Sequence, residues 1–174
     1  MSLKELKEKD FGEGGQGPTA PGHPLKTPQH DPPVVALIGG QGQMGRWFQR
    51  FFESQGLQVL VADLDTLQTP QEVAALADVV IISVPIPSVK QVVREVGGHL
   101  RDGAALMDLT SVKQGPMKAM LASFKGEVVG THPLFGPGED SIAGRTSGAY
   151  VPRDVDPSKD YATARLDSGS LALK

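Results

Sequence analysis

Residues 34–63 constrain the fold of this 174-residue chain more than any other stretch. They open with an apolar, partly β-branched run at 34–38, which is typical of a strand buried on both faces. A glycine-rich turn follows at 39–45, and aromatic residues then recur at helical spacing. A second apolar run at 57–62 ends at an acid, Asp63. Strand, turn, helix and strand in this order predict a βαβ unit.

The turn contains the pattern G-x-G-x-x-G. In a βαβ unit the first glycine permits a tight turn, the second lets the backbone approach a pyrophosphate, and the third lets the helix pack on the strand. The N-terminus of the helix directs backbone N–H groups at the phosphates. The alternative is an ordinary loop, because three glycines alone are weak evidence. We expect a dinucleotide to bind at these residues: Gly40, Gln41, Gly42, Gln43, Met44 and Gly45.

Asp63 follows the motif at close to the usual spacing of about 20 residues. An acid at this place accepts hydrogen bonds from the ribose hydroxyls and repels a 2′-phosphate, which favours NAD over NADP. Two observations leave alternatives open. Asp63 also fits a solvated acid in a turn, and Arg46 is near enough in sequence to accommodate a 2′-phosphate.

Composition excludes several classes of function. The net charge is −3 with scattered basic residues, so the chain lacks the electrostatic footprint of a nucleic-acid-binding protein. No apolar run approaches the length of a membrane span, and the N-terminus lacks the apolar core of a secretory signal. The absence of cysteine excludes disulfides and thiolate chemistry, and the four histidines are isolated. We therefore expect a cytoplasmic enzyme with no metal.

The pattern divides the chain into three parts. Residues 1–31 are rich in glycine and proline and poor in apolar residues, which predicts a flexible leader. Residues 32–152 alternate strand and helix patterns joined by short loops. This alternation predicts an α/β, Rossmann-type doubly wound and mainly parallel sheet with helices on both faces. Residues 153–174 are predicted to be a truncated C-terminal tail.

Further elements are expected within that pattern. A capping box, Thr69-Pro-Gln-Glu72, predicts a helix to about residue 77, and the prolines at 85 and 87 predict irregular structure. Other helices are expected around 89–96 and 117–124, and one is expected to begin within 160–166. The remaining strands are expected at 79–83, 104–108, 128–131 and 148–152.

Polar, proline-marked loops follow three of the expected strands, at 83–85, 108–113 and 132–137. Right-handed crossovers bring the carboxyl ends of parallel strands to one edge of the sheet, where ligands bind. We therefore expect these three loops to converge beside the nicotinamide end of a bound NAD. Ser83, Val84 and Pro85 are the residues of the first loop that we expect to contact the cofactor.

The ordered set of motifs resembles the prephenate/arogenate dehydrogenase family of tyrosine biosynthesis, over roughly residues 33–150. The motifs are GGQGQMG at 39–45, SVP at 83–85, DLTSVK at 108–113 and HPLFGP at 132–137. The resemblance implies NAD(P)-dependent oxidation of prephenate or arogenate, in which a hydride leaves the carbon bearing the 4-hydroxyl and the ring carboxylate is lost.

The resemblance also implies roles for three residues. His132 matches the family's catalytic histidine, which accepts the proton of the substrate hydroxyl. Ser111 matches a serine that hydrogen-bonds the histidine or the substrate, and Lys113 is expected to add positive potential for a dianionic substrate. The alternatives are structural: a strand-end histidine bonded to backbone, a serine that satisfies N–H groups at a helix start, and a solvated surface lysine. His99, beside a glycine turn, is expected to be structural.

Members of the family continue into a largely helical second domain that forms the dimer and holds the substrate carboxylates. We expect that domain to be missing here, which would expose apolar surface and favour homo-oligomers or a partner. Two hypotheses follow: an NAD-dependent prephenate or arogenate dehydrogenase, or a non-catalytic NAD-binding module that needs a partner. A β-hydroxyacid dehydrogenase would instead require a catalytic lysine on a later helix.

Overall fold

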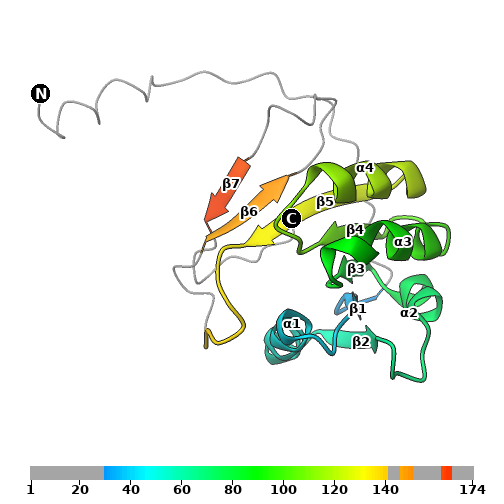
Figure 1. Cartoon of the computed structure of the whole chain (residues 1–174). Coiled ribbons are helices and arrows are strands. Elements are labelled where there is room, and N and C mark those ends of the chain that lie inside the picture. The colour runs from blue at the N-terminus through cyan, green and yellow to red at the C-terminus, as the bar shows by residue number, and fades with distance from the viewer. Residues whose placement is uncertain (1–29, 141–145, 151–161, 166–174) are drawn as a thin grey trace, which may run out of the picture.

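The computed structural model describes residues 30–140, 146–150 and 162–165 (Figure 1). They form a seven-stranded sheet in the order β2-β1-β3-β4-β5-β6-β7. The strands β1 to β5 are parallel, and β6 and β7 continue the sheet antiparallel. The elements are β1 (Val34–Ile38), α1 (Gln43–Ser54), β2 (Gln58–Ala62), α2 (Pro70–Leu76), β3 (Val79–Ile82), α3 (Ile86–Gly97), β4 (Ala105–Asp108), α4 (Gln114–Ser123), β5 (Glu127–Pro133), β6 (Thr146–Tyr150) and β7 (Ala162–Arg165).

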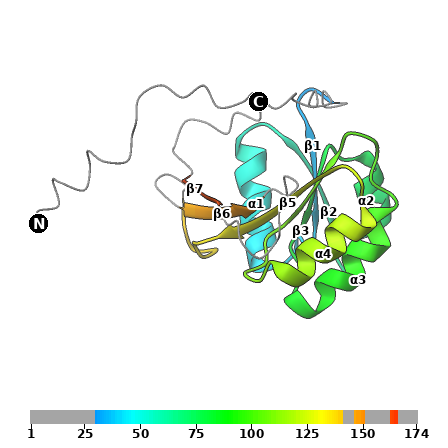
Figure 2. The same ribbon diagram turned by 90° about the horizontal axis from the view of Figure 1, so that it is seen from above.

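Helices cover both faces of the sheet, as the view from above shows (Figure 2). Helix α1 lies on one face, and α2, α3 and α4 lie side by side on the other. The chain turns from β1 towards β2 on one side and then crosses to β3 on the other side of β1. The carboxyl ends of β1 and β3 therefore form a topological switch point, the place where open α/β sheets bind ligands.

Two apolar clusters hold the layers together. On the face of α2 to α4, side chains such as Ile82, Leu106 and Met120 are fully excluded from solvent. On the other face, Leu37 and Ile81 pack with the aromatic residues of α1. All five residues of β1 are buried, as its unbroken apolar run predicts. Burial of each such side chain stabilises the fold by about 1.5–3 kcal/mol relative to exposure.

The predicted fold class is confirmed, and the capping box of α2 is present as predicted. Thr69 accepts a hydrogen bond from the backbone N–H of Glu72, whose carboxylate accepts one from the backbone N–H of Thr69. The prediction of irregular structure through both prolines is wrong, because α3 begins at Ile86. Pro87 lies in the first helical turn, where its missing N–H group costs no hydrogen bond.

The fifth strand is longer than predicted and ends at Pro133, so His132 lies in a strand rather than a loop. The extension pairs antiparallel with β6, where His132 lies opposite Gly148. The strand expected at 148–152 forms two residues earlier, and its antiparallel pairing with β5 was not predicted. The prediction of a helix beginning within 160–166 is wrong, since β7 forms there and pairs with β6. Residues 1–29 of the predicted leader and residues 153–161 and 166–174 of the predicted tail lie outside the described residues, as do residues 151–152 at the end of the predicted domain.

Candidate active site

The glycine turn follows β1 at the switch point between β1 and β3. Gly39 has a φ of +81°, which side chains rarely adopt, and its N–H donates to the carbonyl of Ala62 over 2.8 Å. A Cβ at Gly39 would lie 2.6 Å from the carbonyl oxygen of Ser83 at the end of β3. Only a glycine lets the three strand ends meet this closely, so the turn is fixed by the sheet beneath it.

Helix α1 starts directly against this turn. A Cβ on Gly45 would lie 2.6 Å from both the carbonyl oxygen of Gly39 and the Cα of Gly40. Among the described residues, no side chain caps the N-terminus of α1 and no acid occupies its first turn. The first amide groups and the positive end of the helix dipole are therefore available to an anionic group.

Asp63 is tied to the glycine turn across 22 residues of sequence. Its Oδ2 accepts a hydrogen bond from the backbone N–H of Gln41 at 2.9 Å, and its Oδ1 accepts one from Leu64 at 2.8 Å. The Asp63 N–H donates to the hydroxyl of Thr66. Each carboxylate oxygen keeps a further lone pair, so the group can still accept hydrogen bonds from a ligand beside the turn.

Ser83 and Val84 follow β3 at the other side of the switch point. The N–H of Ser83 donates to the carbonyl of Ile38 at 2.7 Å, and a Cβ on Gly39 would lie 2.8 Å from Val84 Cγ1. Pro85 is exposed and immediately precedes α3. The structure therefore brings the SVP loop and the glycine turn together, although they are about 40 residues apart in sequence.

A buried ion pair lies at the ends of β4 and β5. Lys113 Nζ donates to Asp108 Oδ1 at 2.6 Å, to Asp108 Oδ2 at 2.7 Å and to the carbonyl of Thr131 at 2.6 Å. Asp108 is fully buried and the Lys113 side chain is 7% exposed. Burial lowers the pKa of Lys113 below its ordinary value of 10.5, and the hydrogen bond and charge of Asp108 oppose that shift. The alternative of a solvated surface lysine is wrong.

Ser111 and His132 occupy neighbouring strand ends at the same edge of the sheet. Ser111 is exposed on the loop between β4 and α4, and His132 is half-buried near the end of β5. In the part of the chain that is described, neither side chain hydrogen-bonds the other. Lys113, not Ser111, is the N-cap residue of α4, and it makes no side-chain cap. The structural alternative for Ser111, a cap on this helix, is therefore wrong.

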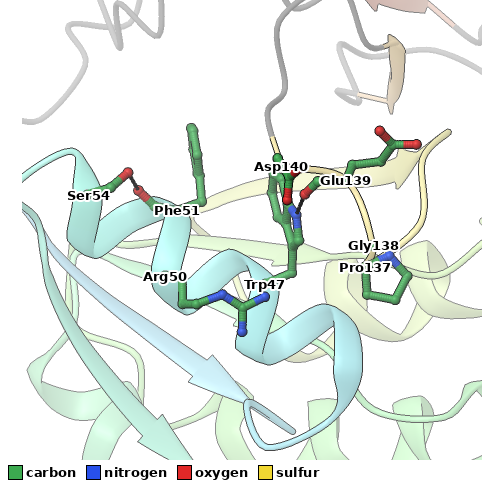
Figure 3. Close-up of a pocket in the computed structure, with 8 residues that line it drawn as sticks. All are labelled: Trp47, Arg50, Phe51, Ser54, Pro137, Gly138, Glu139 and Asp140. Carbon is green, nitrogen blue, oxygen red and sulfur yellow. Dashed lines mark hydrogen bonds between the residues drawn. The ribbon is translucent and has the colours of Figure 1, made fainter.

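The segment after β5 crosses to α1, a feature that the sequence did not indicate. The ring of Phe135 lies 4.9 Å from that of Trp47 and 6.2 Å from that of Phe48, and Trp47 Nε1 donates to the carbonyl of Glu139. A pocket of about 340 Å³ lies between α1 and residues 137–140 (Figure 3). Its lining contains none of the residues predicted to bind cofactor or substrate. The aromatic residue within HPLFGP was the only signal that could have predicted this contact.

A second buried carboxylate, Asp78, lies directly before β3, at the amino-terminal ends of the strands. It accepts hydrogen bonds from the N–H of Val34 at 2.8 Å and from His30 Nδ1 at 2.9 Å, and it pairs with Arg101. These groups join the amino-terminal ends of the strands, away from the predicted ligands. The cluster is therefore structural, and an acid directly before a buried strand was its signal in the sequence.

Comparison with known proteins agrees with this geometry. The family model described as the nucleotide-binding domain of prephenate dehydrogenase matches residues 52–155, more than half of the chain. The chain belongs to this prephenate dehydrogenase family. The match starts within α1, so the glycine turn at 39–45 lies outside the matched residues. Among the helices of the described residues, none has the length and apolar character needed to cross a bilayer.

Two curated relatives agree with the family. A probable arogenate/prephenate dehydrogenase from Methanocaldococcus jannaschii is 36% identical over 125 residues, covering 63% of this chain and 28% of the relative. The T-protein of Enterobacter agglomerans is 40% identical over 109 residues, covering 63% of this chain and 29% of the relative. The chain thus spans less than a third of the length of these relatives.

A solved structure shows the same fold. The arogenate dehydrogenase of Synechocystis superposes with a TM-score of 0.62 over 72% of this chain and 52% of that protein, at 16% identity. In the described residues of this chain, no group of three or more His, Cys, Asp or Glu side chains is arranged to hold a metal ion.

Proposed function

We propose that the chain binds NAD and supplies the nucleotide-binding part of a prephenate or arogenate dehydrogenase. The observation that carries the proposal is the contact of Asp63 with the glycine turn, beside the uncapped N-terminus of α1. It offers N–H donors for a pyrophosphate and a carboxylate for the ribose at one switch point. Family membership supports the same cofactor class.

The residues at the carboxyl ends of β1 to β3 fit NAD. The residues predicted to contact the phosphates, at 40–45, include glycines at which a Cβ would clash with the backbone, and the Asp63 carboxylate can accept further hydrogen bonds. Ser83, Val84 and Pro85 flank the turn on the nicotinamide side. The negative charge of Asp63 favours NAD over NADP, because it would repel a 2′-phosphate. Bound NAD supplies the hydride acceptor for the reaction.

Proton transfer is assigned to His132. As the ring carbon that bears the 4-hydroxyl loses its hydride, the hydroxyl proton passes to a neutral imidazole nitrogen of His132. The carbon becomes a carbonyl-like centre, and the ring carboxylate leaves as carbon dioxide. The electron pair of the broken C–C bond enters the ring, which becomes aromatic, and the former carbonyl oxygen takes up a proton to become the phenol hydroxyl. General base catalysis of this kind raises the reaction rate by about 10²–10⁴-fold. The Ser111 hydroxyl hydrogen-bonds the histidine or the substrate hydroxyl and fixes their geometry.

A second candidate function is an NAD-binding module without activity of its own. The observation that favours it is that the matched family model describes the nucleotide-binding domain. In that case another polypeptide or segment supplies the groups that hold the substrate carboxylates. Positioning the substrate against the cofactor provides much of the rate in such reactions, so binding without turnover is the expected behaviour of the module.

Calorimetric titration of the 174-residue chain with NAD and prephenate, followed by an NADH absorbance assay, separates these functions. Turnover that is abolished by His132→Asn, with NAD affinity retained, supports the dehydrogenase. NAD binding without turnover of prephenate or arogenate supports the module. Absence of NAD binding would contradict both.

A further inference from the structure

The buried pair of Asp108 and Lys113 has a role that the matched motifs do not assign. We propose that it is a positioning device, which holds the Ser111 loop and the His132 end of β5 in one geometry. Lys113 is then a positioning residue and does not bind the substrate. This inference rests on the proposed function, because it concerns how the two proposed catalytic groups are brought together.

The first step is the hydrogen-bonding capacity of Lys113. An ammonium group has three N–H donors and no acceptor. All three find acceptors at 2.6–2.7 Å, two on Asp108 and one on the carbonyl of Thr131. With its side chain 7% exposed, Lys113 has neither a free donor nor the access that a substrate carboxylate needs. Direct substrate binding would require the pair to break and leave Asp108 buried and unpaired.

The second step is the attachment of the Ser111 loop. Asp108 Oδ2 accepts hydrogen bonds from both the backbone N–H and the hydroxyl of Thr110, and the hydroxyl also contacts the carbonyl of Val112. Lys113 holds the loop from the other end. Ser111 is exposed, yet it lies between residues that are anchored to the same buried carboxylate. Its hydroxyl is therefore presented from a fixed backbone.

The third step is the attachment of His132. The ladder between β4 and β5 ends where Asp108 lies opposite Gly130. Beyond that point Thr131 continues the connection, because its hydroxyl donates to the carbonyl of Asp108 at 2.6 Å and its carbonyl accepts from Lys113. The lysine stem passes over Gly130, where a Cβ would lie 3.0 Å from Lys113 Cδ. The residue directly before His132 is thus cross-linked to the Ser111 loop.

These contacts explain why a charged pair is buried at this edge. Removing one partner of a buried pair is strongly destabilising, whereas apolar replacement of both is often tolerated. Stability alone therefore gives little reason for the pair. The alignment of the reacting groups gives a better reason for the pair, since displacing a reacting group by about 1 Å can lower the rate roughly 10²-fold.

The first test follows His132 itself and needs no turnover. The imidazole C–H signals are recorded by NMR in the full chain, and His132→Asn identifies those of His132. Lys113→Met should shift or broaden the His132 signals and leave those of His99, on the α3–β4 turn, unchanged. Lys118→Met, which removes an exposed lysine five positions further along α4, is the control and should change neither. Unchanged His132 signals in Lys113→Met overturn the proposal.

Two variants separate positioning from stability. Thr131→Val removes the hydroxyl contact with Asp108 but keeps both charges, so it should fold and still shift the His132 signals. The double variant Asp108→Asn/Lys113→Met removes both charges, so its melting temperature should return towards that of the wild type. Its His132 signals should stay displaced, because the cross-link is still absent. Recovery of melting temperature and His132 signals together would show a merely structural pair and overturn the proposal.

Kinetics provide the second test if the chain turns over prephenate. Lys113→Met should lower kcat by about 10²-fold and change KM for prephenate by less than about threefold, because alignment rather than binding is lost. A rise in KM with an unchanged kcat would make Lys113 a substrate ligand and overturn the proposal. A wild-type chain that fails to bind NAD would contradict the proposed function instead, and the NMR test would still decide the role of the pair.

Discussion

Replacement of Asp63 by asparagine tests the proposed cofactor site most directly. The carboxylate accepts a backbone N–H on each oxygen, from Gln41 on Oδ2 and from Leu64 on Oδ1. An asparagine amide has one oxygen and one NH₂ group, so in either orientation one of these N–H groups faces a donor. Both hydrogen bonds are exposed, so water can replace the lost acceptor. We expect the free energy of unfolding to fall by less than about 1 kcal/mol.

The effect on NAD binding should be much larger. A hydrogen bond to a charged group contributes about 1.5–3 kcal/mol, and each 1.4 kcal/mol changes Kd about tenfold. Asp63→Asn should therefore raise the Kd for NAD by roughly 10- to 150-fold. Affinity for NADP relative to NAD should rise, because the charge that repels a 2′-phosphate is gone. Calorimetric titration with both nucleotides measures each change.

Asp65→Asn is the matched control, since it removes an exposed acid two residues away. It should leave the affinity for both nucleotides unchanged. The reasoning fails if the wild-type chain binds NAD and Asp63→Asn binds it equally well. That result would place the ribose elsewhere and make the contact of Asp63 with Gln41 a feature of the turn alone.

Two further predictions concern the scaffold. Gly45→Ala would place a methyl group 2.6 Å from backbone atoms of Gly39 and Gly40, so it should lower the free energy of unfolding by about 1–3 kcal/mol and weaken NAD binding. Gly98→Ala is the control, since a methyl group there would have nothing within 4 Å and should change neither quantity. Denaturant titration measures the stability of both variants, and calorimetric titration measures their NAD affinity. The backbone hydrogen bond from Thr69 lowers the pKa of Glu72 below its ordinary value of 4.5. The stability that the ionised Glu72 carboxylate adds to the fold is therefore present above pH 4.5 and is lost as the pH falls through the lowered pKa. Glu72→Gln should therefore flatten the acid limb of the stability curve, and an unchanged limb would contradict this assignment.

The part of the fold that sequence predicts well is the part specified locally. The glycine motif, the apolar run of β1 and the capping box each depend on residues within one or two turns of chain. Their periodicity and turn chemistry are therefore readable without tertiary structure. The same applies to the loop after β3, whose place at the switch point follows from the order of the strands.

The features that sequence missed depend on distant partners. His132 lies in a strand because β6 pairs with it antiparallel, and no pattern near His132 specifies that partner. The surface alternative for Lys113 failed for the same reason, since the carbonyl of Thr131 that helps to bury it lies 18 residues away. A lysine on a loop is expected to be solvated from sequence alone, because the buried carboxylate and the strand end that cover it are brought against it only by the fold.

The two halves of the site are thus held in different ways. The proposed cofactor half is fixed by close backbone packing, because glycines let three strand ends and a helix start meet. The proposed catalytic half lies beyond the last paired residues of β4 and β5, where no ladder continues between them. Side chains must supply the missing cross-links there, and a buried ion pair does so with fixed geometry at both ends. Substitutions of the glycines should therefore affect folding and NAD binding together, whereas loss of the Lys113 cross-link should displace His132 and leave NAD affinity unchanged.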